Sequence, residues 1–251
     1  MGSRMNICSL HRGTLPLLVS LPHDGSHIPD EFATRMVATA RRAPDTDWFV
    51  SRLYEFAIAM GASVLVPTHS RYVVDLNRPE DDVSLYPGQN TTGLCPIVQF
   101  TGEPVYLAGA EPTSAEIAAR VDRYWRPYHD ALGEELTRLH AEHGRVLLWE
   151  GHSIRSRVPF LFEGQLPDFN LGTANGSSCL PGTQEGSSPC YRRRNPTRGS
   201  LMADSRAVTS PAITAGRKTE SRPCSWNSRS ATTWTRTRSS TCRNVRTLSQ
   251  H

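Results

Sequence analysis

Short apolar runs alternate with amphipathic segments along most of the chain. The runs are rich in Leu and Val and predict buried β-strands at residues 15–21, 62–67, 72–74 and 146–149. Two further segments, residues 45–61 and 113–143, carry apolar side chains at helical spacing and end at Gly61 and Gly144. Strands that alternate with helices in this way predict an α/β fold with a mostly parallel sheet.

Two interruptions of this pattern are informative. Pro127 falls inside the longer helical segment and predicts a kink or a break there. Residues 79–109 show little periodicity and are rich in Pro and Gly before Leu94. A loop of this length inside a compact domain is usually functional or disordered, and we expect it to form a wall of the active site.

Residues able to bind a metal follow two of the predicted strands. His23 comes after the strand at residues 15–21, and Glu150 and His152 come after the strand at residues 146–149. Because the carboxyl ends of parallel strands meet at one edge of a sheet, we expect these residues to converge. Nitrogen and oxygen ligands without thiolate are typical of catalytic zinc. A single histidine in a loop is more often solvated. The prediction of a metal site made of His23, an acid and His152 therefore depends on the convergence of these strand ends.

Another strand end, after residues 72–74, carries Asp75, Asn77 and Arg78. A planar guanidinium beside a carboxamide suits the two oxygens of a carboxylate, which favours an acidic small molecule as ligand. The alternative is a solvated turn with a surface ion pair. Asp45 and Asp47 likewise have a simple explanation as acids at a helix start, and either becomes a ligand only with a partner elsewhere.

Charge divides the chain unevenly. The net charge is +4, but residues 1–176 hold 15 Lys and Arg against 21 Asp and Glu, whereas residues 177–251 hold 13 against 3. No apolar run approaches the length that spans a bilayer, and the start lacks the order of a signal peptide, so we expect a cytoplasmic protein without a membrane partner. The six cysteines show no C-x-x-C spacing, which argues against a zinc ribbon or a disulfide framework.

Residues 15–176 resemble the N-formylglutamate amidohydrolase (N-formylglutamate deformylase) family. The resemblance implies a three-layer α/β sandwich like that of zinc carboxypeptidases, with a metal at the sheet edge. It also implies hydrolysis of N-formylglutamate to glutamate and formate, a step of histidine degradation. It rests on motifs that occur in one order, namely His23-Asp24-Gly25, Asp45-Thr-Asp-Trp48, Ser70-Arg-Tyr-Val-Val-Asp-Leu-Asn-Arg78, Tyr86-Pro-Gly-Gln-Asn-Thr-Thr-Gly-Leu-Cys95, Tyr124-Trp-Arg-Pro-Tyr-His129, Gly151-His-Ser-Ile-Arg-Ser156 and Leu171-Gly-Thr173.

The same resemblance implies ligands for a metal and for a substrate carboxylate. His23, Asp47 and His152 fall on the expected ligand positions for Zn²⁺ or another divalent metal. Asn77 and Arg78 match the pair that holds a substrate carboxylate in carboxypeptidase-like relatives.

The substrate and the reaction that the resemblance implies need further groups. N-formylglutamate carries two carboxylates, for which Arg78 and either Arg71 or Arg155 are the cationic partners we expect. Hydrolysis by a metal-activated water also needs a carboxylate that passes a proton to the leaving amine. Glu150 is the acid we nominate for this role, although its position suits orienting His152 as well. Phe49 departs from the family pattern, because a histidine is expected there.

The character of the chain changes after residue 176. Residues 177–251 contain 25 Ser or Thr and only seven Leu, Ile, Val or Met, too few apolar groups to offset the entropy of ordering. Codons can be chosen for residues 202–214 so that translation from the third base of each, in a shifted reading frame, gives Gly-Arg-Phe-Lys-Gly-Gly-Tyr-Ile-Thr-Arg-His. Residues 218–229 read likewise give a string that contains Gln-Leu-Glu-Leu.

Both shifted strings resemble the C-terminal part of the same family. We therefore interpret the chain as a hydrolytic α/β domain at residues 1–176, followed by a frameshifted basic tail at residues 177–251 that has no fold of its own. The family's catalytic glutamate, expected in Gln-Leu-Glu-Leu, is then absent from the protein.

Three functions follow from these observations. The first is a metal-dependent amidohydrolase impaired by the altered tail, and the second is an inactive remnant that binds carboxylates through Asn77 and Arg78. The third is a nucleic-acid binder that uses the basic tail, but its arginines are scattered and not interleaved with stacking aromatics. We expect a small acidic substrate and no nucleic acid, and the sequence predicts no oligomeric state.

Overall fold

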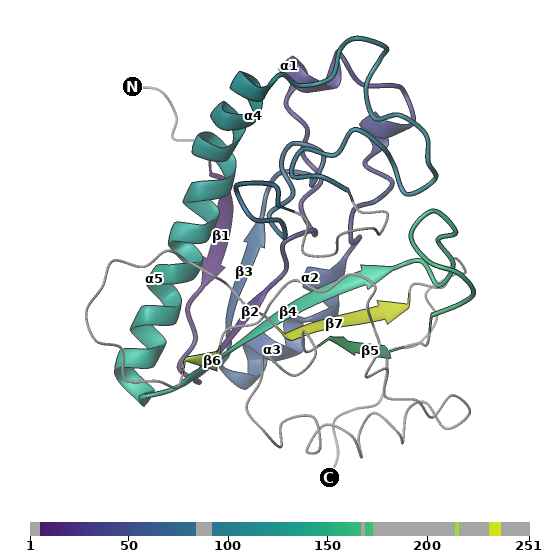
Figure 1. Ribbon diagram of the computed structural model, residues 1–251. Coiled ribbons are helices and arrows are strands. Elements are labelled where there is room, and N and C mark those ends of the chain that lie inside the picture. The colour runs from purple at the N-terminus through teal and green to yellow at the C-terminus, as the bar shows by residue number, and fades with distance from the viewer. Residues whose placement is uncertain (1–5, 84–91, 167–168, 173–213, 216–230, 237–251) are drawn as a thin grey trace.

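A computed structural model describes residues 6–83, 92–166, 169–172, 214–215 and 231–236 (Figure 1). Its centre is one mixed sheet with the strand order β1-β3-β2-β4-β7-β5, and β6 pairs with β4. The strands are β1 (Cys8–His11), β2 (Leu17–Ser20), β3 (Ser63–Pro67), β4 (Val146–Ile154), β5 (Phe169–Gly172), β6 (Thr214–Ala215) and β7 (Ala231–Arg236).

The inner strands of the sheet run parallel, as predicted. Leu18 of β2 lies opposite Ser63 of β3 on one side and Leu148 of β4 on the other. β4 also runs parallel to β7, whereas β1 and β5 pair with their neighbours in antiparallel fashion. The carboxyl ends of β2, β3 and β4 therefore meet at one edge.

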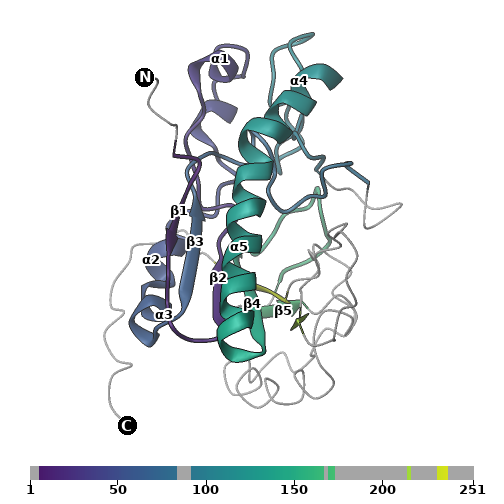
Figure 2. The same ribbon diagram turned by 90° about the vertical axis from the view of Figure 1, so that its left-hand side faces the viewer.

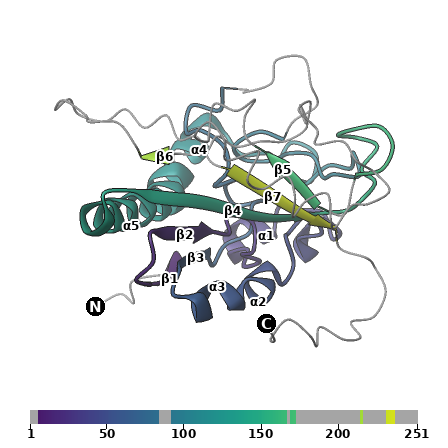
Figure 3. The same ribbon diagram turned by 90° about the horizontal axis from the view of Figure 1, so that it is seen from below.

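Helices cover both faces of the sheet (Figures 2 and 3). Side chains alternate along β2, so that Leu18 packs in one cluster with Leu136 and Leu139 of α5, while Val19 packs with Val50 and neighbours on the opposite face. The helical elements are α1 (Asp30–Ala33), a 3-10 turn (Ala40–Arg42), α2 (Val50–Leu53), α3 (Glu55–Met60), α4 (Ser114–Arg120), a π-helical turn (Val121–Trp125) and α5 (Arg126–His143). None of these described helices is long and apolar enough to cross a membrane.

The long predicted helix at residues 113–143 is present but is not uniform. Thr113 caps its start, and Gly144 ends it in the left-handed region with φ 69°. Pro127 falls in the first turn of α5, and the π-helical turn lies directly before that turn. The break that Pro127 predicted is therefore a local change of helical winding at this point.

The helix predicted at residues 45–61 starts later than expected. It begins at Val50 as α2, and Phe49 before it has a φ of 63°, a value that is rare for a bulky side chain. Asp45 and Asp47 are buried and make tertiary contacts, so the explanation of both as simple helix-start acids is wrong.

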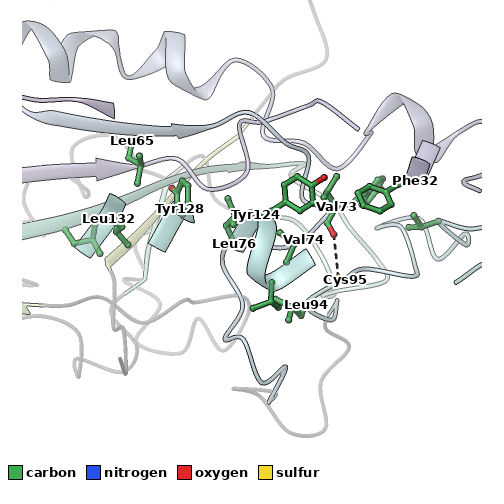
Figure 4. Close-up of a cluster of buried hydrophobic side chains, with 14 of the residues drawn as sticks. Phe32, Leu65, Val73, Val74, Leu76, Leu94, Cys95, Tyr124, Tyr128 and Leu132 are labelled. Carbon is green, nitrogen blue, oxygen red and sulfur yellow. Dashed lines mark hydrogen bonds between the residues drawn. The ribbon is translucent and has the colours of Figure 1, made fainter. Parts of the chain in front are cut away.

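The strand predicted at residues 72–74 is also wrong, although the predicted burial is right. Val73 is fully buried but lies in a turn, where its carbonyl accepts hydrogen bonds from Arg120 and from the Cys95 thiol (Figure 4). Arg120 also donates to the carbonyl of Tyr72. A single buried guanidinium thus satisfies backbone groups that a neighbouring strand would otherwise satisfy.

The described strands beyond residue 176 join the sheet of the N-terminal part. β7 pairs with β4 from Ala231 opposite Trp149 to Arg236 opposite Ile154. The remainder of residues 177–251 lies outside the described residues, so the absence of an independent fold there stays a prediction. Residues 84–91 of the predicted active-site wall also lie outside them.

Candidate active site

His23 follows β2 at the sheet edge, on a tightly packed loop. The amide of Asp47 donates to the His23 carbonyl at 2.9 Å, which ties the loop to the segment before α2. Gly25 lies so close to His69 that an added Cβ would sit 2.3 Å from the His69 carbonyl oxygen. Only glycine fits there, and the close approach fixes the direction in which the chain leaves His23.

The His23 ring is buried and held by a carboxylate. Its Nε2 lies 2.7 Å from Oδ1 of Asp75, and since a carboxylate only accepts, Nε2 carries the proton. Burial, together with the nearby Arg71 charge, lowers the pKa of His23 to about 4. His23 is therefore neutral at pH 7, and the lone pair of its Nδ1 is available.

Asp75 holds three groups at once. Besides His23, its carboxylate accepts from Arg71 Nη2 at 2.6 Å and from the amide of Asn77 at 2.9 Å. Burial alone would raise the pKa of Asp75, but the Arg71 charge and the hydrogen bond from His23 outweigh burial and hold this pKa well below its usual range. Asp75 is thus an anion that orients His23.

His152 lies beside His23, on the neighbouring strand. The sequence placed it after a strand, but β4 continues through Glu150 and His152 to Ile154. Nδ1 of His152 lies 3.1 Å from Oδ2 of Asp47, and its Nε2 lies 3.3 Å from Nδ2 of Asn77. The centroids of the two imidazole rings are 4.8 Å apart.

His23, Asp47 and His152 form a buried cluster with the donor set of a metal site. One ligand atom from each lies within 4.8 Å of the others, and Nδ1 of His23 is 3.7 Å from Oδ2 of Asp47. Among the described residues this Nδ1 is buried without a hydrogen-bond partner. In a tetrahedral zinc site, ligands about 2.0–2.1 Å from the ion are about 3.3 Å apart. The three residues therefore fit a divalent metal with two nitrogen ligands and one oxygen ligand.

The cationic residues named from the sequence occupy different positions around this cluster. Arg71 is 3% exposed, pairs with Asp75 and lies over the ring of Phe100 at 4.8 Å. Nε of Arg78 is buried and has no hydrogen-bond partner among the described residues. The Arg155 side chain is 49% exposed and donates to Oδ1 of Asp45 at 3.1 Å. Arg155 is thus the most accessible of the three.

A cavity of about 250 Å³ adjoins the cluster. Its wall combines apolar rings with charged and polar groups, and it joins the segment before α2 to the end of β4. Asp47 connects it to the histidines, and Arg155 supplies a positive charge. The lining residues are Pro44, Asp45, Thr46, Asp47, Trp48, Phe100, Ser153, Ile154 and Arg155.

Glu150 lies on the same sheet face as His152, because the two are separated by one residue of β4. Leu148, two residues earlier on this face, packs in one cluster with Leu132 and Leu136 of α5, so Glu150 also faces α5. Burial raises the pKa of the Tyr128 hydroxyl well above its usual range, and the Glu150 charge adds to this rise. The same hydroxyl lies 2.8 Å from Oγ of Ser20. Glu150 therefore faces α5 and is not among the residues that line the cavity.

The role of Asp45 has no signal in the sequence. Its carboxylate accepts from the Tyr72 hydroxyl at 2.6 Å, from the amide of Phe100 at 2.8 Å and from Arg155. These partners come from three distant segments, which local spacing cannot reveal. Asp45 thereby fixes one wall of the cavity.

Known proteins resemble this chain in sequence and in fold. A family model described as N-formylglutamate amidohydrolase matches residues 15–193. N-formylglutamate deformylases from Pseudomonas putida and Pseudomonas aeruginosa are each 51% identical to it over 175 residues, 70% of this chain and 65% of the relative. The chain thus spans about two thirds of the length of these relatives.

Two solved structures share the fold. The crystal structure of N-formylglutamate amidohydrolase from Ralstonia eutropha JMP134 gives a TM-score of 0.66 at 25% identity, covering 92% of this chain and 86% of that one. Gene product Atu2144 from Agrobacterium tumefaciens gives 0.56 at 16% identity, covering 92% and 84%, and this second likeness concerns the fold alone.

Proposed function

Since the chain belongs to the N-formylglutamate amidohydrolase family, we propose that it hydrolyses N-formyl-L-glutamate to L-glutamate and formate with the help of a divalent metal, zinc being the first choice. The observation that carries the proposal is the buried group of His23, Asp47 and His152, with its nitrogen and oxygen donors beside a cavity. We place the reaction in histidine degradation and the protein in the cytoplasm. The proposed architecture is a three-layer sandwich like that of zinc carboxypeptidases.

The residues of the cluster would hold the metal in a defined geometry. His23 offers Nδ1, because Asp75 retains the proton on Nε2. Asp47 offers a carboxylate oxygen between the two histidines. A zinc ion bound there supplies Lewis acidity, which activates water and polarises the formyl oxygen.

The cations around the cavity suit a substrate with two carboxylates. Arg155 lines the cavity, and Arg78 with Asn77 lies on the other side of His152. Arg71 is buried against Asp75, so its part is to keep that carboxylate charged and to contribute positive potential to the site. The formyl group would then lie at the histidines, with one substrate carboxylate on each side.

In this chain the acid that would protonate the leaving amine is poorly placed. Glu150 is the acid we assign to this task in place of the glutamate that the frameshift removes. It lies on the face of β4 that packs against α5 and does not line the cavity, which makes it a poor donor there. General acid–base catalysis contributes a factor of about 10² to 10⁴ to the rate. We therefore propose that this chain hydrolyses N-formylglutamate at an impaired rate.

The test compares this chain with a version whose reading frame is restored after residue 176. Formate release from N-formylglutamate is measured for both at matched zinc content. We expect the chain as written to be at least about 10²-fold slower. Equal rates would show that the altered tail removes no essential group.

The same preparations decide between the candidate functions. The His152→Ala variant should lose bound zinc, whereas the exposed-histidine control His140→Ala should keep it. Binding of N-formylglutamate without turnover in both versions would favour the carboxylate-binding remnant. Binding of DNA that weakens with salt, together with no zinc, would favour the basic-tailed nucleic-acid binder.

A further inference from the structure

One face of the α4–α5 helical segment contacts the backbone that carries Asn77 and Arg78. The indole Nε1 of Trp125 donates to the carbonyl of Arg78 at 2.9 Å. Nε2 of His129 lies 3.0 Å from the carbonyl oxygen of Leu76. Because a carbonyl only accepts, this Nε2 carries the proton and donates. The two donors therefore hold the peptide groups 76–77 and 78–79, which flank the pair of Asn77 and Arg78.

The two rings form one unit. Their centroids are 3.7 Å apart at an interplanar angle of 26°, and the residues are four apart on one helix face. Burial lowers the pKa of His129 to about 4, so the ring is neutral at pH 7. Trp125 ends the π-helical turn, and such turns are frequent at functional sites.

Among the described residues, no β-strand pairs with the segment that these rings hold. The amide of Asn77 donates to the Asp75 carboxylate, and the amide of Arg78 donates to the Asp75 carbonyl. The carbonyls on the other side are held by Trp125 and His129. Each peptide group in this stretch is therefore fixed by a named hydrogen bond, and the helix supplies half of these bonds.

We propose that Trp125 and His129 are positioning residues that fix Asn77 and Arg78 for a substrate carboxylate. Nδ2 of Asn77 lies 3.3 Å from Nε2 of His152. A shift of the Asn77 backbone would therefore change the geometry at the proposed metal site. The proposal rests on the proposed function for the identity of the substrate. The hold on the backbone can be tested without it.

The experiment uses the full zinc-loaded chain and four variants. Trp125→Phe and His129→Leu each remove one donated hydrogen bond, and His129→Gln keeps a donor near the same place. Trp149→Phe is the matched control, because it removes an indole hydrogen bond to the Tyr54 hydroxyl on the other face of the sheet. Amide hydrogen exchange of residues 76–78 and the calorimetric dissociation constant of N-formylglutamate are measured for each.

We expect amide exchange at residues 76–78 to be about three- to tenfold faster in Trp125→Phe and His129→Leu, the factor that one lost hydrogen bond gives. N-formylglutamate should bind more weakly by a similar factor. His129→Gln should restore both values to within about twofold, and Trp149→Phe should leave both unchanged.

Three results would overturn the proposal. Unchanged exchange in both donor-deleting variants rules out the hold on the backbone. Faster exchange with unchanged binding rules out the role toward substrate, and equal effects in Trp149→Phe show a general loss of stability. If the parent chain binds no N-formylglutamate, the proposed function fails, and the exchange data alone decide whether Trp125 and His129 position this segment. If His129→Leu does not fold, Trp125→Phe carries the comparison.

Discussion

Replacing Asp75 by asparagine tests the electrostatic centre of the site. The Asp75 side chain is fully buried and accepts from Nε2 of His23, from Nη2 of Arg71 and from the amide of Asn77. A carboxamide offers one accepting oxygen in place of two. Its NH₂ group must face another donor, either the Arg71 guanidinium or the His23 ring.

The expected loss of stability follows from these contacts. Arg71 is 3% exposed, and without Asp75 it would be a buried cation whose nearest counter-charge is gone. Removal of one partner from a buried ion pair costs about 3–5 kcal/mol in the free energy of unfolding. With a urea dependence of about 2–3 kcal/mol per molar, the unfolding midpoint should fall by about 1–2.5 M.

A second effect should appear in metal binding. Asp75 fixes the ring of His23 with Nδ1 toward the cluster, and loss of such an orienting carboxylate lowers metal affinity by about 10- to 100-fold. Urea unfolding followed by circular dichroism measures the first effect. Competition with a chromogenic zinc chelator measures the second.

Asp122→Asn is the control for both measurements. Asp122 pairs with Arg126 on the exposed side of the helix, where the side chains are 64% and 54% exposed. Loss of this pair should cost less than about 0.5 kcal/mol and leave zinc binding unchanged. If Asp75→Asn lost no more stability than this control, the description of Asp75 as the anion that holds His23 and Arg71 would be refuted.

Three further predictions concern the scaffold around the site. Gly25→Ala should lower the thermal midpoint by several degrees, because its Cβ would lie 2.3 Å from the His69 carbonyl oxygen; an unchanged melting curve would contradict this packing. Burial lowers the pKa of His69 from 6.5 to about 4, so the unfolded state binds a proton at a higher pH than the folded state does. The free energy of unfolding should therefore decline as the pH falls from 6.5 to about 4, and this residue contributes at most about 3 kcal/mol to the decline. His69→Gln should show a shallower decline in urea titrations over that range, and an identical slope would count against it. Arg120→Met keeps the aliphatic stem but leaves the carbonyls of Tyr72 and Val73 without this donor, which should cost about 1–3 kcal/mol or more in urea unfolding.

The elements with clear periodicity were predictable from sequence. The apolar runs around β2, β3 and the first half of β4 gave the parallel sheet, and the rule that site residues follow strand ends brought His23 and His152 together. β4 runs on through Glu150 and His152 because β2 and β7 pair with it, and no apolar pattern marks that extension.

The failures of the sequence patterns have one common physical cause. The run at residues 72–74 reads as a strand because it is apolar, yet its carbonyls are satisfied by Arg120, which lies nearly fifty residues away in the chain. Asp45 reads as a helix cap, yet its partners are Tyr72, Phe100 and Arg155. In each case a polar side chain from a distant segment replaced a local interaction, and local patterns carry no information about such contacts.

The separation of the cluster residues along the chain also bears on the order of folding. His23 contacts Asp75 across 52 positions, and Asp47 contacts His152 across 105. Contacts that close such long stretches of chain form slowly, after local helices and turns. The proposed metal ligands therefore come together only when β2 and β4 are paired. A metal that binds the assembled cluster would stabilise the folded state by mass action. Zinc added to a refolding mixture should raise the yield of native protein while leaving the earliest steps unchanged, so that metal uptake itself reports when folding is complete.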